Sequence, residues 1–189
     1  MPLGLNRSYR NFTFLITCAA ALSACNQPSE EATSNGSNPA LACAFALAPS
    51  DDSSGCVAHI VSSLSLEQKI GQMIQGEIRD VTPDDVRNFY LGSVLNGGGG
   101  FPNSDKYSTV SDWVQLADDY YNASLDTSAG GAGIPIVWGT DAVHGHNNVM
   151  GATLFPHNIG LGATRDTELV SQIIGATARE VKATGIDWI

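Results

Sequence analysis

Apolar residues recur at helical spacing in several stretches of this chain. "SLSLEQKIGQMIQ" follows a hydroxyl residue with an apolar stripe, which predicts a capped amphipathic helix. The stripe consists of Leu66, Ile70, Met73 and Ile74. "TPDDVRNFYL" predicts a second helix with Thr82 as its N-cap, and "VSDWVQLADDYYNASL" predicts a third. "RDTELVSQIIGATAREVKATG" predicts a long helix that is capped by Asp166 or Thr167 and stops at Gly185.

Short β-branched runs between these helices predict strands. "GSVLNGGGG" gives a strand over Ser93–Leu95, and "IPIVWG" (Ile134–Gly139) is apolar throughout, like strands buried on both faces of a parallel sheet. "IDWI" predicts the start of another strand. Strands and helices alternate without hairpin signals, which favours a (β/α)₈ barrel or an open doubly wound sheet. Barrels need about 250 residues. The segment Leu41–Ile189 is far shorter and stops inside a strand pattern, so we expect a truncated domain.

The first 25 residues have the pattern of a signal peptide. Arg7 and Arg10 precede the apolar run Phe12–Ala24, which at about a dozen residues is too short to span a bilayer. The run ends in "LSAC", which resembles the lipobox of bacterial lipoproteins and predicts lipidation of Cys25. Ordinary cleavage after Ala24 is the alternative. Asn26 favours sorting to the outer membrane, so we expect an exported protein of the bacterial cell envelope, either an outer-membrane lipoprotein or periplasmic.

Residues 26–60 predict a tether that leads into the folded domain at 61–189. "NQPSEEATSNGSNP" lacks large apolar residues and should be solvated. Disulfides persist in exported proteins, so Cys43 and Cys56 are candidates for pairing. With 9 basic and 19 acidic residues, the net charge of −10 opposes binding to nucleic acid.

The glycine run Gly97–Gly100 resembles a phosphate loop only superficially. It lacks the Lys-Ser/Thr of a P-loop, and Pro102 and Asn103 follow it where a Gly-x-Gly-x-x-Gly motif would open a helix. We therefore expect a strand-end loop in unusual backbone conformations.

His144 and His146 form an H-x-H pair after a predicted strand, an arrangement that can bind a metal. Two ligands seldom make a catalytic site, and Asp141 or His157 would have to supply a third. Gly145 and the asparagines that follow instead indicate a sharply turning loop held by hydrogen bonds. Metal binding is therefore the minor alternative.

Asp141 is the sharper candidate, because it comes two residues after "IPIVWG" and should project at the carboxyl-terminal rim of the sheet. A carboxylate there can accept hydrogen bonds from two adjacent sugar hydroxyls, each worth about 1.5–3 kcal/mol. A loop-capping aspartate is the alternative role. Trp138 lies within the strand and should belong to the core.

Four segments resemble the N-terminal part of glycoside hydrolase family 3: "KIGQM", "GSVLNGGG", "IPIVWGTDAVHGHNNVMGATLFPHNIGLGATRD" and "EVKATGIDW". The likeness runs from about Leu64 to Ile189 and is strongest to β-glucan exohydrolases and β-glucosidases of bacteria and plants. It implies an α/β fold, an incomplete (β/α)₈ TIM-type barrel that is followed in the family by an α/β sandwich domain. It also implies release of glucose from non-reducing ends with retention, and no metal or other cofactor.

The family's G-x-D-A-V-H-G aspartate falls on Asp141, which the resemblance makes a substrate-binding residue of subsite −1. It implies loop-ordering roles for His144, His146, Asn147, Asn148, His157 and Asn158. Trp138 and Thr140 depart from the common Y-G-I-D but leave the aspartate in place. The family's nucleophilic aspartate and acid/base glutamate come later in the chain than "TGIDW". We therefore expect no catalytic residue within these 189 residues and no turnover by this chain alone.

Two other functions compete with the β-glucosidase interpretation. An anchored glucan-binding protein would use Asp141 to bind sugar without hydrolysis. A metal-dependent hydrolase would use His144 and His146. The expected partners under the family interpretation are a β-glucan or β-glucoside substrate and outer-membrane lipid through Cys25.

Overall fold

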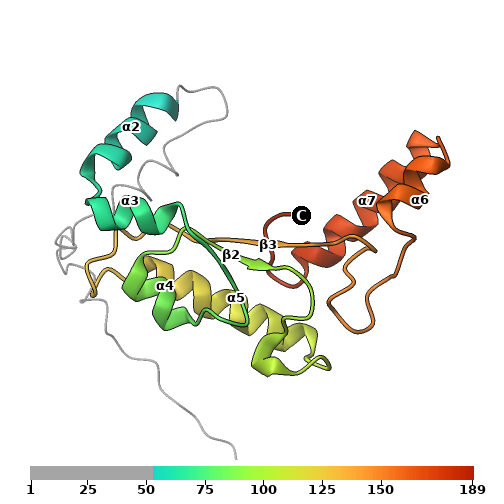
Figure 1. The fold of residues 1–189 in the computed structure, drawn as a ribbon, viewed down its shortest axis with the longest axis horizontal. Helices are drawn as coiled ribbons and strands as arrows, with labels where there is room; N and C mark the ends of the chain where they lie inside the picture. The colour runs from blue at the N-terminus through green and yellow to red at the C-terminus, as the bar shows by residue number, and fades with distance from the viewer. Residues whose placement is uncertain (1–52) are drawn as a thin grey trace, which may run out of the picture. The chain divides into compact units, whose positions relative to one another are not determined.

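The computed structural model describes residues 53–189. The elements are α2 (Ser53–Ser63), α3 (Leu66–Gln72), β1 (Gln75–Glu77), α4 (Pro83–Phe89), β2 (Ser93–Asn96), the 3₁₀ turn η1 (Pro102–Ser104), α5 (Val110–Leu125), β3 (Val137–Thr140), α6 (Asn158–Ala163) and α7 (Thr167–Lys182) (Figure 1). The predicted signal peptide, Cys25, Cys43 and the tether as far as residue 52 lie outside the described residues. Within residues 53–189, no helix has the length and apolar character needed to cross a membrane.

The three strands form a parallel sheet in the order β1-β2-β3. Gln75 pairs with Ser93, and Ser93 in turn pairs with Val137. "IDWI" adds the start of a fourth strand, because Trp188 forms a parallel bridge with Gly139 on the free side of β3. Each strand therefore lies beside its predecessor in sequence, the order of a (β/α)₈ barrel rather than of a doubly wound sheet.

The helix starts are set by local side-chain caps. Ser65, Thr82 and Thr109 each form a capping box, and the Asp166 side chain accepts from Leu169 N–H at 3.0 Å. The Thr82 hydroxyl and backbone N–H bind the Asp85 carboxylate and lower its pKa. The predicted helices after Thr82, Thr109 and Asp166 are confirmed.

The first predicted helix is shorter than expected. It ends at Gln72, and Gln75–Glu77, which we placed partly in the helix, form β1. The cause is pairing with β2, because the backbone of these residues bonds to the neighbouring strand instead of continuing the helix. Its apolar stripe lies largely at the surface, since Leu66 and Met73 are 67% and 79% exposed.

Other boundaries moved as well. β3 starts at Val137 instead of Ile134 and continues to Thr140, and β2 extends to Asn96. The helices α2 and α6 and the turn η1 were not predicted. Cys56 lies in α2 and is disulfide-bonded, but since Cys43 is outside the described residues, their pairing stays a prediction.

The core lies between the sheet and the α4–α5 pair, which run side by side in Figure 1. Val94 of β2 and Trp113 of α5 are almost completely buried. Trp138 stacks on Trp113 with ring centroids 6.0 Å apart and meets Tyr120 edge-on at 5.6 Å. Trp138 is therefore a core residue, as predicted, and fixes β3 against α5.

Candidate functional site

Asp141 follows the last residue of β3 and is exposed at the carboxyl-terminal end of the sheet. Its backbone N–H donates to the carbonyl of Asn96, the last residue of β2, at 3.1 Å. The ends of β2 and β3 are thus joined directly at the rim position that the sequence predicts for Asp141. In parallel α/β folds this edge is where ligands bind.

Asn96 is buried below this edge and holds it together by hydrogen bonds. Its side chain is fully buried, and Nδ2 donates to the Gly100 carbonyl at 3.1 Å. Its backbone carbonyl accepts from both Asp141 N–H and, at 3.2 Å, the Thr140 hydroxyl. Sequence reasoning missed Asn96, because a polar residue at a strand end gives no signal that its side chain turns inward.

The glycine loop lies against the same edge, as predicted. Gly98 and Gly99 have φ values of +103° and +77°, which L-residues rarely adopt. A Cβ on Gly97 would lie 3.8 Å from the Asp141 carboxylate oxygen Oδ2. The loop therefore bounds the space beside the Asp141 carboxylate on the β2 side.

A cleft opens on the other side of Asp141. It is open to solvent and is lined by the loop that follows β3 (residues 141–157, the rim loop) together with α6 and α7. Among the described residues that line it, Asp141 is the one acidic side chain, while Val143, Phe155 and Leu161 contribute apolar surface. A carboxylate beside apolar walls suits a sugar ring, which presents hydroxyls at its edge and C–H groups on its faces.

His144 and His157 meet on the outer side of the rim loop. Their rings form an edge-on pair with centroids 5.1 Å apart. His144 Nδ1 lies 3.1 Å from the Phe155 carbonyl, and His157 Nδ1 accepts from Ile159 N–H at 3.2 Å, capping α6. Gly145, between His144 and His146, has φ +77°, and a Cβ there would collide with the Thr153 carbonyl.

His146 points the opposite way, into the core. It is fully buried, and Nε2 lies 2.9 Å from the Thr184 hydroxyl, just before the fourth strand. Burial lowers the pKa of its imidazole, and Glu180 opposes this shift. Because the Thr184 hydroxyl donates to the Val181 carbonyl, Nε2 must carry the proton and Nδ1 is left without a partner among residues 53–189.

The histidine pair therefore does not fit the metal alternative. His144 is at the surface and His146 is in the core, bonded to different partners. Among residues 53–189, no group of three histidines, cysteines or carboxylates is placed to hold a metal ion. The polar side chains next to Asp141, Thr140 and Asn148, are a hydroxyl and an amide, and neither carries a charge.

Glu77 at the end of β1 is a second carboxylate near this edge that the sequence analysis did not single out. Its Oε2 binds Arg79, and its Oε1 is buried with no hydrogen-bond partner in the described part of the chain, close to Gly100. Together with burial, which is the larger cause, Glu77 raises the pKa of Tyr120 to about 12. No sequence signal marked Glu77, because β1 itself was not predicted.

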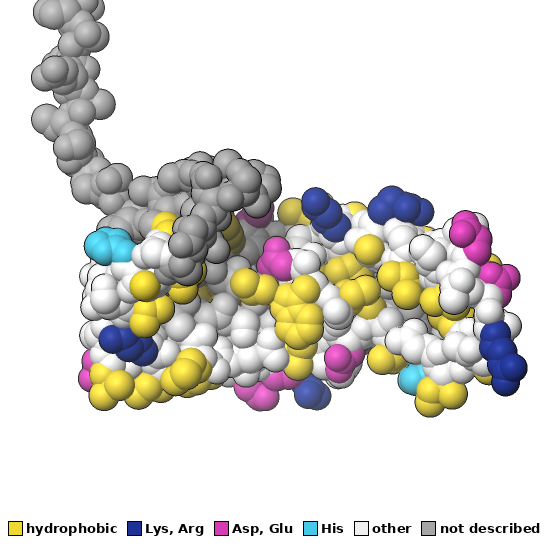
Figure 2. Space-filling view, turned by 90° about the horizontal axis from the view of Figure 1, so that it is seen from above, with side chains coloured by type: hydrophobic (Ala, Val, Ile, Leu, Met, Phe, Trp, Pro, Cys, Tyr) yellow, Lys and Arg dark blue, Asp and Glu magenta, His cyan; other side chains and the backbone are white. Residues whose placement is uncertain are grey.

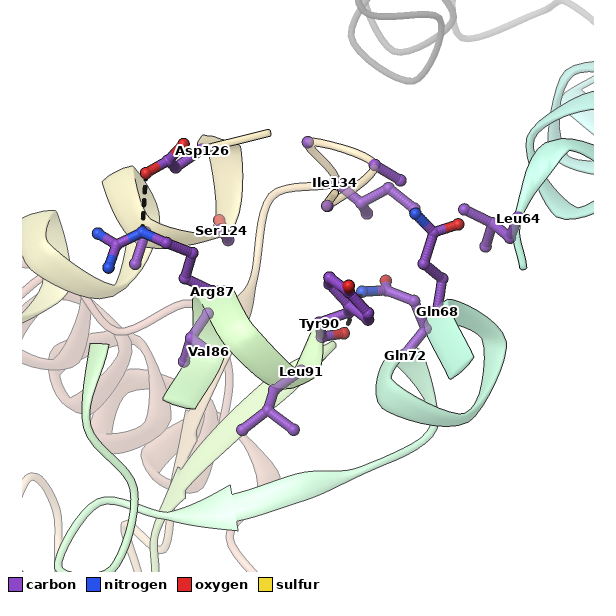
Figure 3. Close-up of a pocket in the computed structure, with 14 residues that line it drawn as sticks. Leu64, Gln68, Gln72, Val86, Arg87, Tyr90, Leu91, Ser124, Asp126 and Ile134 are labelled. Atoms are coloured by element: carbon purple, nitrogen blue, oxygen red, sulfur yellow. Dashed lines mark hydrogen bonds and ion pairs between the residues drawn. The ribbon is translucent and has the colours of Figure 1, made fainter. Parts of the chain in front are cut away.

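A second cavity lies at the opposite, amino-terminal ends of the strands (Figure 3). Its polar groups bond to one another or to the loop before β3: Arg87 Nε to Asp126 at 2.7 Å, and Gln68 Nε2 to the Gly130 carbonyl at 2.7 Å. The Tyr90 hydroxyl donates to the Ala129 carbonyl at 3.0 Å. These groups hold that loop in place, so we assign the cavity a structural role.

Comparisons with known proteins agree on the family. The profile of the glycosyl hydrolase family 3 N-terminal domain matches residues 65–189. The lysosomal beta glucosidase of Dictyostelium discoideum is 33% identical over 147 residues, which cover 70% of this chain and 18% of that protein.

Two solved structures give the same result. The exo-1,3/1,4-beta-glucanase ExoP from a Pseudoalteromonas species is 50% identical with a TM-score of 0.68, over 71% of this chain and 17% of that one. A point mutant of the same enzyme matches with a TM-score of 0.67 and 50% identity, over 71% of this chain and 22% of that chain. The chain thus spans less than a quarter of the length of each relative. Its parallel strands and helices form part of a TIM-type barrel, and the chain belongs to glycoside hydrolase family 3, with the N-terminal domain of that family at residues 65–189.

Proposed function

We propose that the protein expressed from the complete gene is a glycosidase that releases glucose from the non-reducing ends of β-glucans or β-glucosides, with retention of configuration. One observation carries the proposal: Asp141 projects from the carboxyl-terminal rim, between the glycine loop and an open cleft, as the one acidic side chain among the described residues that line the cleft. The exo-glucanase and β-glucosidase names of the relatives support the same substrate class.

Asp141 has the properties of a sugar ligand. A carboxylate has two oxygens that accept hydrogen bonds, so it can hold two neighbouring hydroxyls of a terminal glucosyl unit. Retention requires two further carboxyl groups about 5 Å apart, one as nucleophile and one as acid/base. The family resemblance assigns both to positions that follow "TGIDW", so Asp141 acts by binding and orientation.

The test is Asp141→Asn in the protein expressed from its complete gene. We expect kcat/KM for a β-glucoside to fall about 10- to 100-fold, because two charge-assisted hydrogen bonds become neutral ones. The matched control is Asp80→Asn, a carboxylate that follows β1 on the exposed surface. An unchanged kcat/KM in Asp141→Asn would rule out the binding role.

NMR of the first product formed should show the β-anomer of glucose if configuration is retained.

We further propose that residues 1–25 direct export and that Cys25 is lipidated, with the solvated tether leading into the domain at 61–189. The support is the sequence "LITCAAALSAC" followed by Asn26. Metabolic labelling with a fatty acid tests it. Label should enter the wild-type protein and be absent from Cys25→Ser, whereas equal labelling of both would overturn the anchor.

A further inference from the structure

The Asn148 side chain donates to two neighbouring residues of the rim at once. Its Nδ2 donates to the Thr140 hydroxyl oxygen at 3.1 Å and to the Asp141 carbonyl at 3.4 Å. The residue is 5% exposed, so it cannot itself present much surface to a sugar. We propose that Asn148 is a positioning residue that sets the direction of the Asp141 carboxylate in the cleft. This inference rests on the proposed sugar-binding function of Asp141.

The backbone of Asp141 is held from both sides. Its N–H donates to the Asn96 carbonyl, and its C=O accepts from Asn148. Fixing both peptide groups fixes the direction of the Cα–Cβ bond between them, and hence where the carboxylate can reach. The Asn96 contact is a strand-pairing bond, whereas the contact on the carbonyl side depends on the Asn148 side chain alone.

The chemistry of this position requires a donor. The Thr140 hydroxyl donates to the Asn96 carbonyl, so its oxygen is left to accept. The Asp141 carbonyl also only accepts. An amide NH₂ satisfies both, while an aspartate of the same shape would place a buried carboxylate against two acceptors.

The same side chain also packs near the glycine loop. A Cβ on Gly98 would lie 4.0 Å from Asn148 Oδ1, and Asn96 in turn fixes the far end of that loop through Gly100. Asn148 therefore joins the rim loop to the end of β3 by hydrogen bonds and lies near the β2 glycine loop. A change at Asn148 should move the Asp141 carboxylate relative to both walls of the site.

The experiment measures the inhibition constant of glucose against β-glucoside hydrolysis by the protein expressed from its complete gene. This constant does not depend on how much of the protein is active, so partial unfolding leaves it unchanged. The variants are Asn148→Asp and Asn148→Ala, the second of which removes the donor without adding a buried charge. Asn147→Asp is the matched control, because the Asn147 Oδ1 that accepts from His144 N–H at 3.2 Å is retained.

We expect the inhibition constant to rise about tenfold in Asn148→Asp and in the same direction, by less, in Asn148→Ala, because small displacements of a binding group are costly. The rise should exceed that in Asn147→Asp. In the Asp141→Asn background, adding Asn148→Asp should change the constant by less than about twofold, since the two residues act through one contact.

Two results would overturn the proposal, and they differ. If Asp141→Asn raises the constant while the Asn148 variants match Asn147→Asp, Asn148 is only a structural residue and the role of Asp141 stands. If Asp141→Asn itself leaves the constant unchanged, the proposed function fails and the positioning role fails with it.

Discussion

His146 connects the rim loop to the start of the fourth strand through one buried hydrogen bond to Thr184. The neutral ring satisfies that bond, and protonation of Nδ1 would create a donor that no residue in 53–189 accepts. Burial accordingly lowers the pKa of His146 below the value of about 6.5 that it has when unfolded. At the scale of the residue, the folded state therefore accommodates the neutral imidazole better than the charged imidazolium.

This preference predicts a pH dependence of stability. Between the lowered pKa and about 6.5 the unfolded chain binds more protons than the folded one, so stability should fall as the pH drops through this window and level off below it. His146→Gln keeps an Nε2 donor for Thr184 and removes the titration, and should therefore lose less Tm between about pH 7.5 and about pH 5. His144→Gln, at an exposed position, is the control and should follow the wild type. Equal pH dependence in wild type and His146→Gln would contradict this account.

The start of α5 shows how one element is specified by adjacent residues. The Thr109 hydroxyl donates to the Asp112 carboxylate at 2.7 Å, and that carboxylate accepts from the Thr109 N–H at 2.7 Å. These bonds lower the pKa of Asp112. Thr109→Ala removes the hydroxyl, which donates to that carboxylate and accepts from the Asp112 N–H at 3.3 Å, and should cost about 1 kcal/mol of unfolding free energy, measured by urea denaturation. Thr127→Ala at an exposed position beyond the other end of α5 should cost less, and an equal cost would contradict the cap.

Local signals of this kind explain which elements could be predicted. α4, α5 and α7 carry a cap residue, a polar first turn and a helical apolar pattern within a few residues of each other, so their sequences sufficed. β1 carries only "QGE", which has no apolar run, and becomes a strand through pairing with β2. Asp141 could be placed because it directly follows an apolar strand. Asn96 and Glu77 could not, since their positions depend on contacts between strands.

At the scale of the molecule, polar and apolar groups are divided between two regions. At the ends of the strands, the Asp141 N–H donates to the Asn96 carbonyl and the Asp141 carbonyl accepts from the Asn148 side chain. Apolar residues on the helices remain exposed, and Figure 2 shows such side chains gathered over α6 and α7. Ile159 and Ile174 are 81% and 50% exposed. Exposed apolar residues in this density favour association with other surfaces.

The isolated 189-residue chain should therefore neither turn over substrate nor behave as a well-dispersed monomer. The described lining of the cleft beside Asp141 has one acidic residue, whereas retaining hydrolysis needs a pair of carboxyl groups in addition to the ligand. Within the described residues β1 has β2 on one side only, and an unpaired strand edge together with exposed apolar helix faces promotes aggregation.

Size-exclusion chromatography should show self-association, and incubation with laminaribiose or an aryl β-glucoside should release no glucose. If the chain binds glucose without hydrolysing a glucoside, and Asp141→Asn weakens that binding, the site binds sugar but lacks its catalytic carboxyl groups. Turnover by this chain would instead show that Asp141 and its neighbours do more than hold the sugar.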